Sequence, residues 1–163
     1  MNLFITRATE RDVPLILHFI RGLADYEQLL ETVVATEDRL STTLFGPNPG
    51  AEVVLAYQDG EPVGFALYFF NYSTFLGLPG MYLEDLFVLP EARGKGVGRQ
   101  ILRYLARSAK ERGCGRLEWA VLDWNEPAIR FYKRLGAVPM DEWTVFRLTG
   151  DALQGLAEAG DKA

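Results

Sequence analysis

Apolar positions along the chain change their spacing from segment to segment, between every second residue and every third or fourth. Runs of apolar and β-branched residues predict strands at 3–7, 52–57, 63–70, 83–89, 116–122 and 143–148. Helical spacing predicts helices that begin after Thr9, Thr36, Gly98 and Asn125 and end near Leu23, Phe45, Arg112 and Leu135. Residues 71–80 predict a loop, and residues 157–163 predict a frayed tail. Antiparallel hairpins followed by a strand–helix–strand unit predict an α/β (α+β) fold, a mixed sheet flanked by helices, in a single domain over 1–163.

The stretch from Leu83 to Gly98 joins a strand to a helix through a glycine-rich loop. Pro90 ends the strand because it lacks the N–H group that a strand ladder needs. Glycines then occupy every second position, at 94, 96 and 98, before the helical pattern begins. Glycine lets backbone N–H groups approach a ligand closely at the positive end of a helix dipole. The stretch therefore predicts an anion-binding site.

The bulk composition narrows the function classes. The chain has 163 residues, a net charge of −5 and a pI near 5.0, which argues against a nucleic-acid binder and permits cationic ligands. Cys114 is the single cysteine and His18 the single histidine, so we expect no disulfide, no cysteine or histidine metal cluster and no metal cofactor. His18 lies beside an apolar stripe and is expected at the surface. No signal peptide and no membrane-spanning run is recognised, so the cytoplasm is the expected location.

Two nucleotide-binding motifs do not fit the glycine loop. A Walker A loop needs Ser or Thr after Gly-Lys, but Gly96 follows Lys95. A Rossmann fingerprint that starts at Gly94 needs glycine at position 99, which is Arg99. The pattern Arg93-x-x-Gly96-x-Gly98 instead resembles the acyl-CoA pyrophosphate loop of the GNAT superfamily of N-acetyltransferases.

A second motif follows the loop after one helix and one strand. Asn125, Ala128 and Tyr132 are spaced to share one face of a helix, and the small residue between two polar ones suits a narrow ligand. The alternative gives Asn125 only a capping role and Tyr132 only a packing role. With the closing Gly136, this motif again resembles a GNAT acetyltransferase.

The resemblance narrows to the spermidine/spermine (diamine) acetyltransferase branch and spans roughly residues 3–148. It is carried by Tyr82–Val88 and by Trp124–Arg134, with support from Tyr26-Glu27 and Trp143. Members of that branch are homodimers that move acetyl from acetyl-CoA to a small amine. The resemblance therefore implies a homodimeric enzyme with acetyl-CoA as cosubstrate and a small cationic amine as acceptor.

The same resemblance assigns roles to residues. The acetyl and pantetheine groups would lie against Phe87, Val88 and Leu89. The pyrophosphate would be held by Arg93, Gly94, Lys95, Gly96, Val97, Gly98 and Arg99, and the rest of acetyl-CoA would pass Asn125, Ala128 and Tyr132. Glu84 would act as base through a water and Tyr132 as acid. The acceptor would be bound by Tyr26, Glu27, Glu84, Asp85 and Trp143. Glu31 and Asp123 are further acids from separate stretches of the sequence.

Three points stay open at this stage. Strand alternation puts Asp85 on the face opposite Glu84, so a shared role needs a local bulge or a second subunit. Glu84 is alternatively an ion-pair partner in the sheet. Ser73 and Phe75 stand where polyamine enzymes carry an acid and a tryptophan, with a short insertion at 78–80, so a thialysine-like acceptor fits as well as spermidine.

Two other functions compete with small-amine acetylation. One is acetylation of a protein N-terminus or lysine side chain, which an open peptide groove would favour. The other is a CoA-binding sensor that lost turnover, against which the intact set of Glu84, Asn125 and Tyr132 argues.

Overall fold

The computed structural model describes residues 2–160. The chain divides into two compact units, residues 1–122 and residues 123–163, and each is described by itself. Whether the chain is one domain, as the sequence predicts, stays a prediction. Among the described residues no helix has the length and apolar character needed to cross a membrane.

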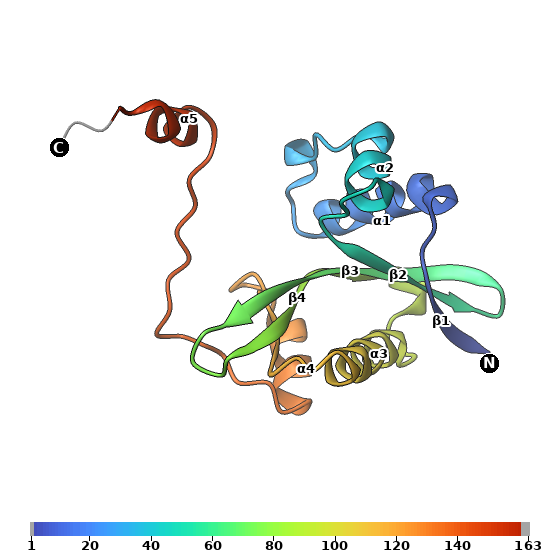
Figure 1. Cartoon of the computed structure of the whole chain (residues 1–163). Helices are drawn as coiled ribbons and strands as arrows, with labels where there is room; N and C mark the ends of the chain where they lie inside the picture. The colour runs from blue at the N-terminus through green and yellow to red at the C-terminus, as the bar shows by residue number, and fades with distance from the viewer. Residues whose placement is uncertain (1, 161–163) are drawn as a thin grey trace. The chain divides into compact units, whose positions relative to one another are not determined.

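The first unit is built on a five-stranded mixed sheet in the order β1-β2-β3-β4-β5 (Figure 1). The strands are β1 (Leu3–Arg7), β2 (Glu52–Gln58), β3 (Glu61–Ser73), β4 (Leu78–Val88) and β5 (Leu117–Trp119). The first four pair antiparallel, and β4 pairs parallel with β5. The predicted mixed sheet is therefore confirmed.

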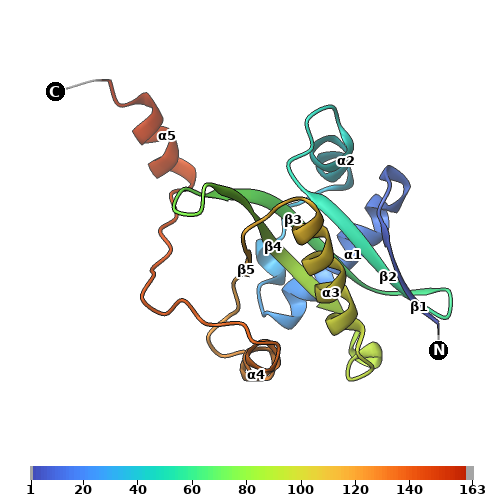
Figure 2. The same cartoon turned by 60° about the horizontal axis from the view of Figure 1, so that its bottom comes forward.

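Helices cover both faces of this sheet (Figures 1 and 2). One face carries η1 (Glu10–Asp12), α1 (Val13–Tyr26), η2 (Leu30–Thr32) and α2 (Glu37–Phe45), and the other carries α3 (Val97–Glu111). The core under α1 and α2 joins Ile16 and Phe19 to Leu55, Phe65 and Phe87 of the sheet. Since all of these side chains are apolar and at least nine-tenths buried, this contact holds α1 against β4.

The predicted helix caps form as expected. Thr9 and Asp12 make a capping box, with the Thr9 N–H donating to Asp12 Oδ2 at 2.7 Å. Thr36 Oγ1 accepts from the Arg39 N–H at 3.2 Å at the start of α2. These contacts fix where the helices enter the face of the sheet.

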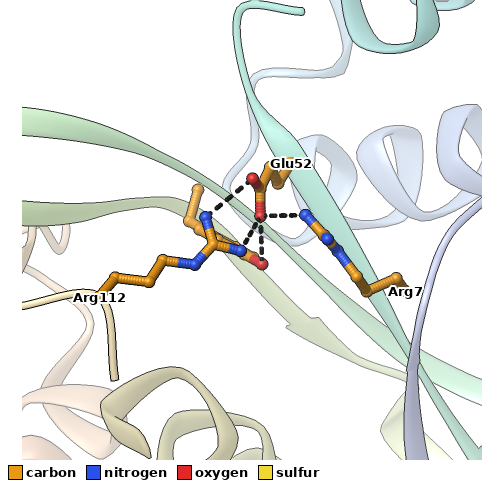
Figure 3. A network of polar contacts seen from close by, with 4 residues as sticks. Arg7, Glu52 and Arg112 are labelled. Atoms are coloured by element: carbon orange, nitrogen blue, oxygen red, sulfur yellow. Dashed lines mark hydrogen bonds and ion pairs between the residues drawn. The ribbon is translucent and has the colours of Figure 1, made fainter. Parts of the chain in front are cut away.

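A polar network joins three strands to the end of α3 (Figure 3). Arg112, the residue after α3, donates to both carboxylate oxygens of Glu52 at 2.9 and 2.8 Å. Tyr68 Oη donates to Glu52 Oε2 at 2.9 Å, and Arg7 Nη2 lies 2.6 Å from the same oxygen. Burial alone would raise the pKa of Glu52, but these hydrogen bonds and the charges of Arg112 and Arg7 lower it to about 2. The contact of Glu52 with Arg112 therefore holds the end of α3 against the sheet.

Two sequence predictions on the sheet were wrong in extent. Residues 71–80 are largely strand, because β3 runs to Ser73 and β4 starts at Leu78. A short turn remains, in which the Leu76 N–H donates to Ser73 Oγ at 3.3 Å and Gly77 has φ 66°. The fifth strand, predicted over 116–122, is limited to Leu117–Trp119. Turn-forming residues in a long hairpin were thus read as a loop.

The second unit holds α4 (Glu126–Arg134) and α5 (Gly150–Glu158). The predicted cap is present, since Asn125 Oδ1 accepts from the Ala128 N–H at 3.4 Å. The strand predicted at 143–148 is absent from the described chain, and Phe146 is 93% exposed. The predicted fraying from 157 is wrong for Ala157 and Glu158, which end α5, while 161–163 lie outside the described residues.

Candidate functional site

The glycine loop has the predicted strand–loop–helix geometry. β4 ends at Val88, a short η3 (Pro90–Ala92) follows, and α3 begins at Val97. Gly94 and Gly96 have φ of 74° and 84°, in the left-handed region that favours glycine. The first intrahelical bond runs from the Gln100 N–H to the Gly96 carbonyl at 3.0 Å. The amides of residues 97–99 therefore have no acceptor within the helix and can serve an anion.

One edge of β4 is open next to this loop. Its ladder with β5 covers only Met81–Leu83, so residues 84–88 pair with β3 alone within the described sheet. The Leu89 N–H donates to the Val63 carbonyl at 2.9 Å and is therefore used. Because N–H groups alternate between strand edges, the Val88 N–H faces the open edge. The open edge can accept an extended ligand through Val88, whereas Leu89 has no free amide to offer.

A β-bulge gathers the acidic residues of β4. In the ladder with β3, Leu67 pairs with Asp85 and Tyr68 pairs with Leu83, so Glu84 is the extra residue. Asp85 follows the register of Phe87 toward the face covered by α1, while Glu84 is exposed. The bulge required for a shared role of Glu84 and Asp85 is therefore present in the chain itself.

Two carboxylates, Glu84 and Glu27, act on a third, Asp85, at this bulge. Burial, followed by the negative charges of Glu84 and Glu27, raises the pKa of Asp85 from 3.8 to about 6. Burial likewise raises the pKa of Glu27, which directly follows α1. Glu27, Glu84 and Asp85, from two segments, thus form an acidic site in which the charges of Glu84 and Glu27 disfavour ionisation of Asp85, so a bound cation would be favourable there.

The end of α1 is held close to β4 by aromatic contacts. A Cβ placed on Gly22 would lie 2.9 Å from Phe87 Cε1, so only glycine fits there without a shift. The Arg93 guanidinium carbon lies 4.6 Å from the centre of the Tyr26 ring and 5.5 Å from that of Phe87. Arg93 Nε also donates to the Val88 carbonyl at 2.9 Å. Nothing in the sequence pattern pointed to this contact, because Tyr26 and Arg93 lie on separate elements.

The remaining predicted residues fall into two groups. Lys95 is exposed in the loop and Arg99 is exposed in the first turn of α3. Val97 is buried at the start of α3. Asn125, Ala128, Tyr132 and Trp143 belong to the second unit, where Asn125 is 8% exposed and Trp143 is 74% exposed. The first unit therefore brings together Tyr26, Glu27, Glu84 and Asp85 of the predicted acceptor site.

Most of the other residues singled out in the sequence lie at the surface, and Ser73 is the buried exception among those named here. His18 is exposed on α1, as expected, and Glu31 is exposed in η2. Phe75 is 99% exposed at the β3–β4 turn, while Ser73 is buried in that turn. Over the described part of the chain, no group of three or more His, Cys, Asp or Glu residues has the arrangement of a metal site.

Comparisons with known proteins show which family and which solved structures this chain resembles. The sequence model of the Acetyltransferase (GNAT) family matches residues 21–137. The chain is 41% identical to the thialysine N-epsilon-acetyltransferase of Sus scrofa, over 96% of this chain and 98% of that protein. It is 34% identical to the L-ornithine N5-acetyltransferase of Arabidopsis thaliana, over 93% of this chain and 86% of that protein. An integron cassette protein from the mobile metagenome of V. cholerae has a solved structure that superposes with a TM-score of 0.81 at 31% identity, covering 98% of this chain and 99% of that one.

Proposed function

Because this chain belongs to the GNAT family of acetyltransferases, we propose that it moves an acetyl group from acetyl-CoA to a primary amine of a small cationic acceptor. The acceptor would be a diamine, a polyamine or a thialysine- or lysine-like amine. The observation that carries the proposal is the acidic site of Glu27, Glu84 and Asp85 beside the open edge of β4. Curated relatives named for thialysine and L-ornithine support an acceptor with a positively charged end.

The acetyl-CoA site would use the glycine loop and the open edge of β4. GNAT acetyltransferases use acetyl-CoA as a cosubstrate. The amides of residues 97–99 suit the pyrophosphate, with Lys95 and Arg99 as nearby cations. The Val88 N–H suits the carbonyl oxygen of the acetyl group, where negative charge grows during transfer. Gly94 and Gly96 fit this assignment. Both have a left-handed φ, and neither carries a side chain that would keep the ligand away from the loop amides.

The acceptor must lose a proton before it reacts, because an alkylammonium has a pKa near 10 and no lone pair. We assign this step to Glu84, which is exposed at the bulge and can take the proton through a water. Asp85 and Glu27 would hold the second charged group of the acceptor. Tyr132 stays the predicted acid for the departing thiol, a role that substitution can test.

We further propose a homodimer in the cytoplasm. The end of β3 and the β3–β4 turn support an interface, because Tyr72 is 60%, Phe75 99% and Leu76 55% exposed. A monomer seldom leaves a cluster of large apolar side chains in water. Sedimentation of the wild type and of Phe75→Ser would test the dimer. A wild type that sediments as a monomer at micromolar concentration would remove this part of the proposal.

The proposed activity is tested by incubating the full chain with acetyl-CoA and a short diamine or a lysine-like amine. Free thiol release and the mass of the product report the same event independently. We expect one acetyl group on the amine and a rate that falls with added salt, because charge attraction guides the acceptor. Thiol release without an acetylated amine would show hydrolysis and contradict the proposal.

A further inference from the structure

We propose that Arg93 is a positioning residue that fixes the last turn of α1 against the Val88 peptide and so couples the acceptor site to the open edge of β4. This deepens the proposed function, on which its kinetic test depends. It differs from the role expected from the sequence, in which Arg93 contacts the pyrophosphate.

The contacts of Arg93 run in two directions from one guanidinium. Its Nε donates to the Val88 carbonyl at 2.9 Å. This carbonyl lies on the open edge of β4, as does the Val88 N–H. Its guanidinium carbon lies 4.6 Å from the centre of the Tyr26 ring, within the range of a cation–π contact. Since Tyr26 ends α1 and Glu27 follows it, one side chain bridges the two halves of the proposed site.

The Arg93 guanidinium contacts the rings of Tyr26 and Phe87 and the Val88 carbonyl. Within the described chain no ion pair joins Arg93 to an acid. The pKa of Asp85 is raised by burial of its carboxyl group and then by the charges of Glu84 and Glu27. Arg93 therefore acts on the acidic site through the placement of Tyr26 and Glu27, which makes its effect geometric.

The end of α1 needs such a contact. Gln28 has φ 61°, a left-handed conformation that is unfavourable for a residue with a side chain. The Glu27 N–H donates to the Leu23 carbonyl at 2.9 Å and the Leu29 N–H to the Ala24 carbonyl at 2.8 Å, which closes the helix over Glu27. A strained turn of this kind persists when neighbouring contacts hold it. Arg93 supplies such a contact to Tyr26 from the loop that follows β4, and its guanidinium also lies over the Phe87 ring of β4.

The variants Arg93→Met, Tyr26→Leu and the double change test the coupling, with Lys95→Met as the matched loss of a loop cation. For Arg93→Met we expect an amine KM that rises roughly 3- to 10-fold at saturating acetyl-CoA. Calorimetry should give an acetyl-CoA Kd within about twofold of the wild type. The double variant should lose clearly less than the product of the single losses, since both remove the same contact. Arg93→Lys keeps the positive charge, so its amine KM should lie between those of Arg93→Met and the wild type.

Lys95→Met should show the reverse pattern, a raised acetyl-CoA Kd with an unchanged amine KM. If Arg93→Met behaves like Lys95→Met, then Arg93 is a phosphate ligand and the inference is overturned. Fully multiplicative effects of Arg93→Met and Tyr26→Leu would overturn it as well.

Hydrogen exchange on the full chain supplies a readout that does not need turnover. The amides of Glu27 and Leu29 should exchange faster in Arg93→Met than in the wild type, and should be unchanged in Lys95→Met. Equal exchange in all three proteins would contradict a positioning role. A wild type that acetylates no amine would defeat the proposed function alone, and the exchange experiment would still decide the role of Arg93.

Discussion

Replacing Asp85 by Asn should stabilise the protein above neutral pH. The folded state raises the pKa of this carboxyl from 3.8 to about 6, chiefly through burial and then through Glu84 and Glu27. The folded protein therefore holds the proton more tightly than the unfolded chain. The resulting stability is fully present below pH 3.8 and is lost as the pH rises through about 6.

The magnitude follows from the size of the shift. The difference between a pKa of 3.8 and one of about 6 corresponds to about 3 kcal/mol, which is the upper limit of the penalty at pH 7.5. Asn keeps the shape of the carboxyl group without the charge. Asp85→Asn should thus gain up to about 3 kcal/mol at pH 7.5 and close to nothing at pH 4. It should also raise the amine KM, because one carboxylate that attracts the acceptor is gone.

Glu52 supplies the matched control with the opposite sign. Its folded pKa of about 2 lies below the ordinary 4.5, so its stability is present above pH 4.5 and is lost as the pH falls through about 2. Glu52→Gln should therefore cost up to about 3 kcal/mol at pH 7.5, which is what the difference between a pKa of 4.5 and one of about 2 corresponds to. Its side chain is 27% exposed, so solvent screening brings the measured cost below that limit.

The assay is urea unfolding of the wild type and both variants at pH 4, 6 and 7.5, followed by fluorescence and circular dichroism. The difference in unfolding free energy between Asp85→Asn and the wild type should grow with pH over this range. A variant that is no more stable than the wild type at pH 7.5, or one whose gain is equal at every pH, would refute the account of the acidic site.

Three further substitutions test the remaining assignments. Gly96→Val puts a β-branched residue at φ 84° and should weaken acetyl-CoA binding at least about tenfold by calorimetry, so an unchanged Kd would refute the loop assignment. Tyr132→Phe should lower turnover by roughly 10²–10⁴-fold with acetyl-CoA binding little changed, and turnover within a factor of two would make Tyr132 a packing residue. Glu84→Gln should depress turnover most at neutral pH and less at high pH, where free amine is abundant, and a defect equal at every pH would point to binding instead.

The sequence predicted the order of strands and helices in the first unit because local signals were strong. Thr9 and Thr36 are favourable N-caps and both start their helices as expected. Between the two apolar runs predicted at 52–57 and 63–70, Asp59 and Gly60 both have positive φ, as a tight hairpin turn requires. The glycine loop was predicted because the required backbone conformation admits few residues other than glycine.

The sequence did not predict features that depend on partners far along the chain. The Glu52 network joins Arg7, Tyr68 and Arg112, and no local spacing relates these residues. The contact of Arg93 with Tyr26 depends on how α1 packs on β4, which Gly22 and Phe87 determine. The hairpin at 71–80 was read as loop because its polar and small residues pair across strands, a context that single-sequence propensity does not contain.

The acidic site was predicted in part. Resemblance to a family proposed Glu27, Glu84 and Asp85 together, while alternation alone separated Glu84 from Asp85. The bulge at Glu84 resolves this, because one unpaired residue moves Asp85 onto the face that α1 covers. A bulge leaves no distinct mark in an apolar strand, so the sequence indicated the need for it without showing it.

The most direct test of the central claim is the ratio of kcat/KM values over a matched panel of amines. The panel is a short diamine, a lysine-like amino acid, spermine and a monoamine with an uncharged tail of similar length. The account predicts the highest values for the first two, because carboxylates from two segments meet a short cation. Comparable values for all four amines would show that Glu27, Glu84 and Asp85 do not select the acceptor and would contradict it.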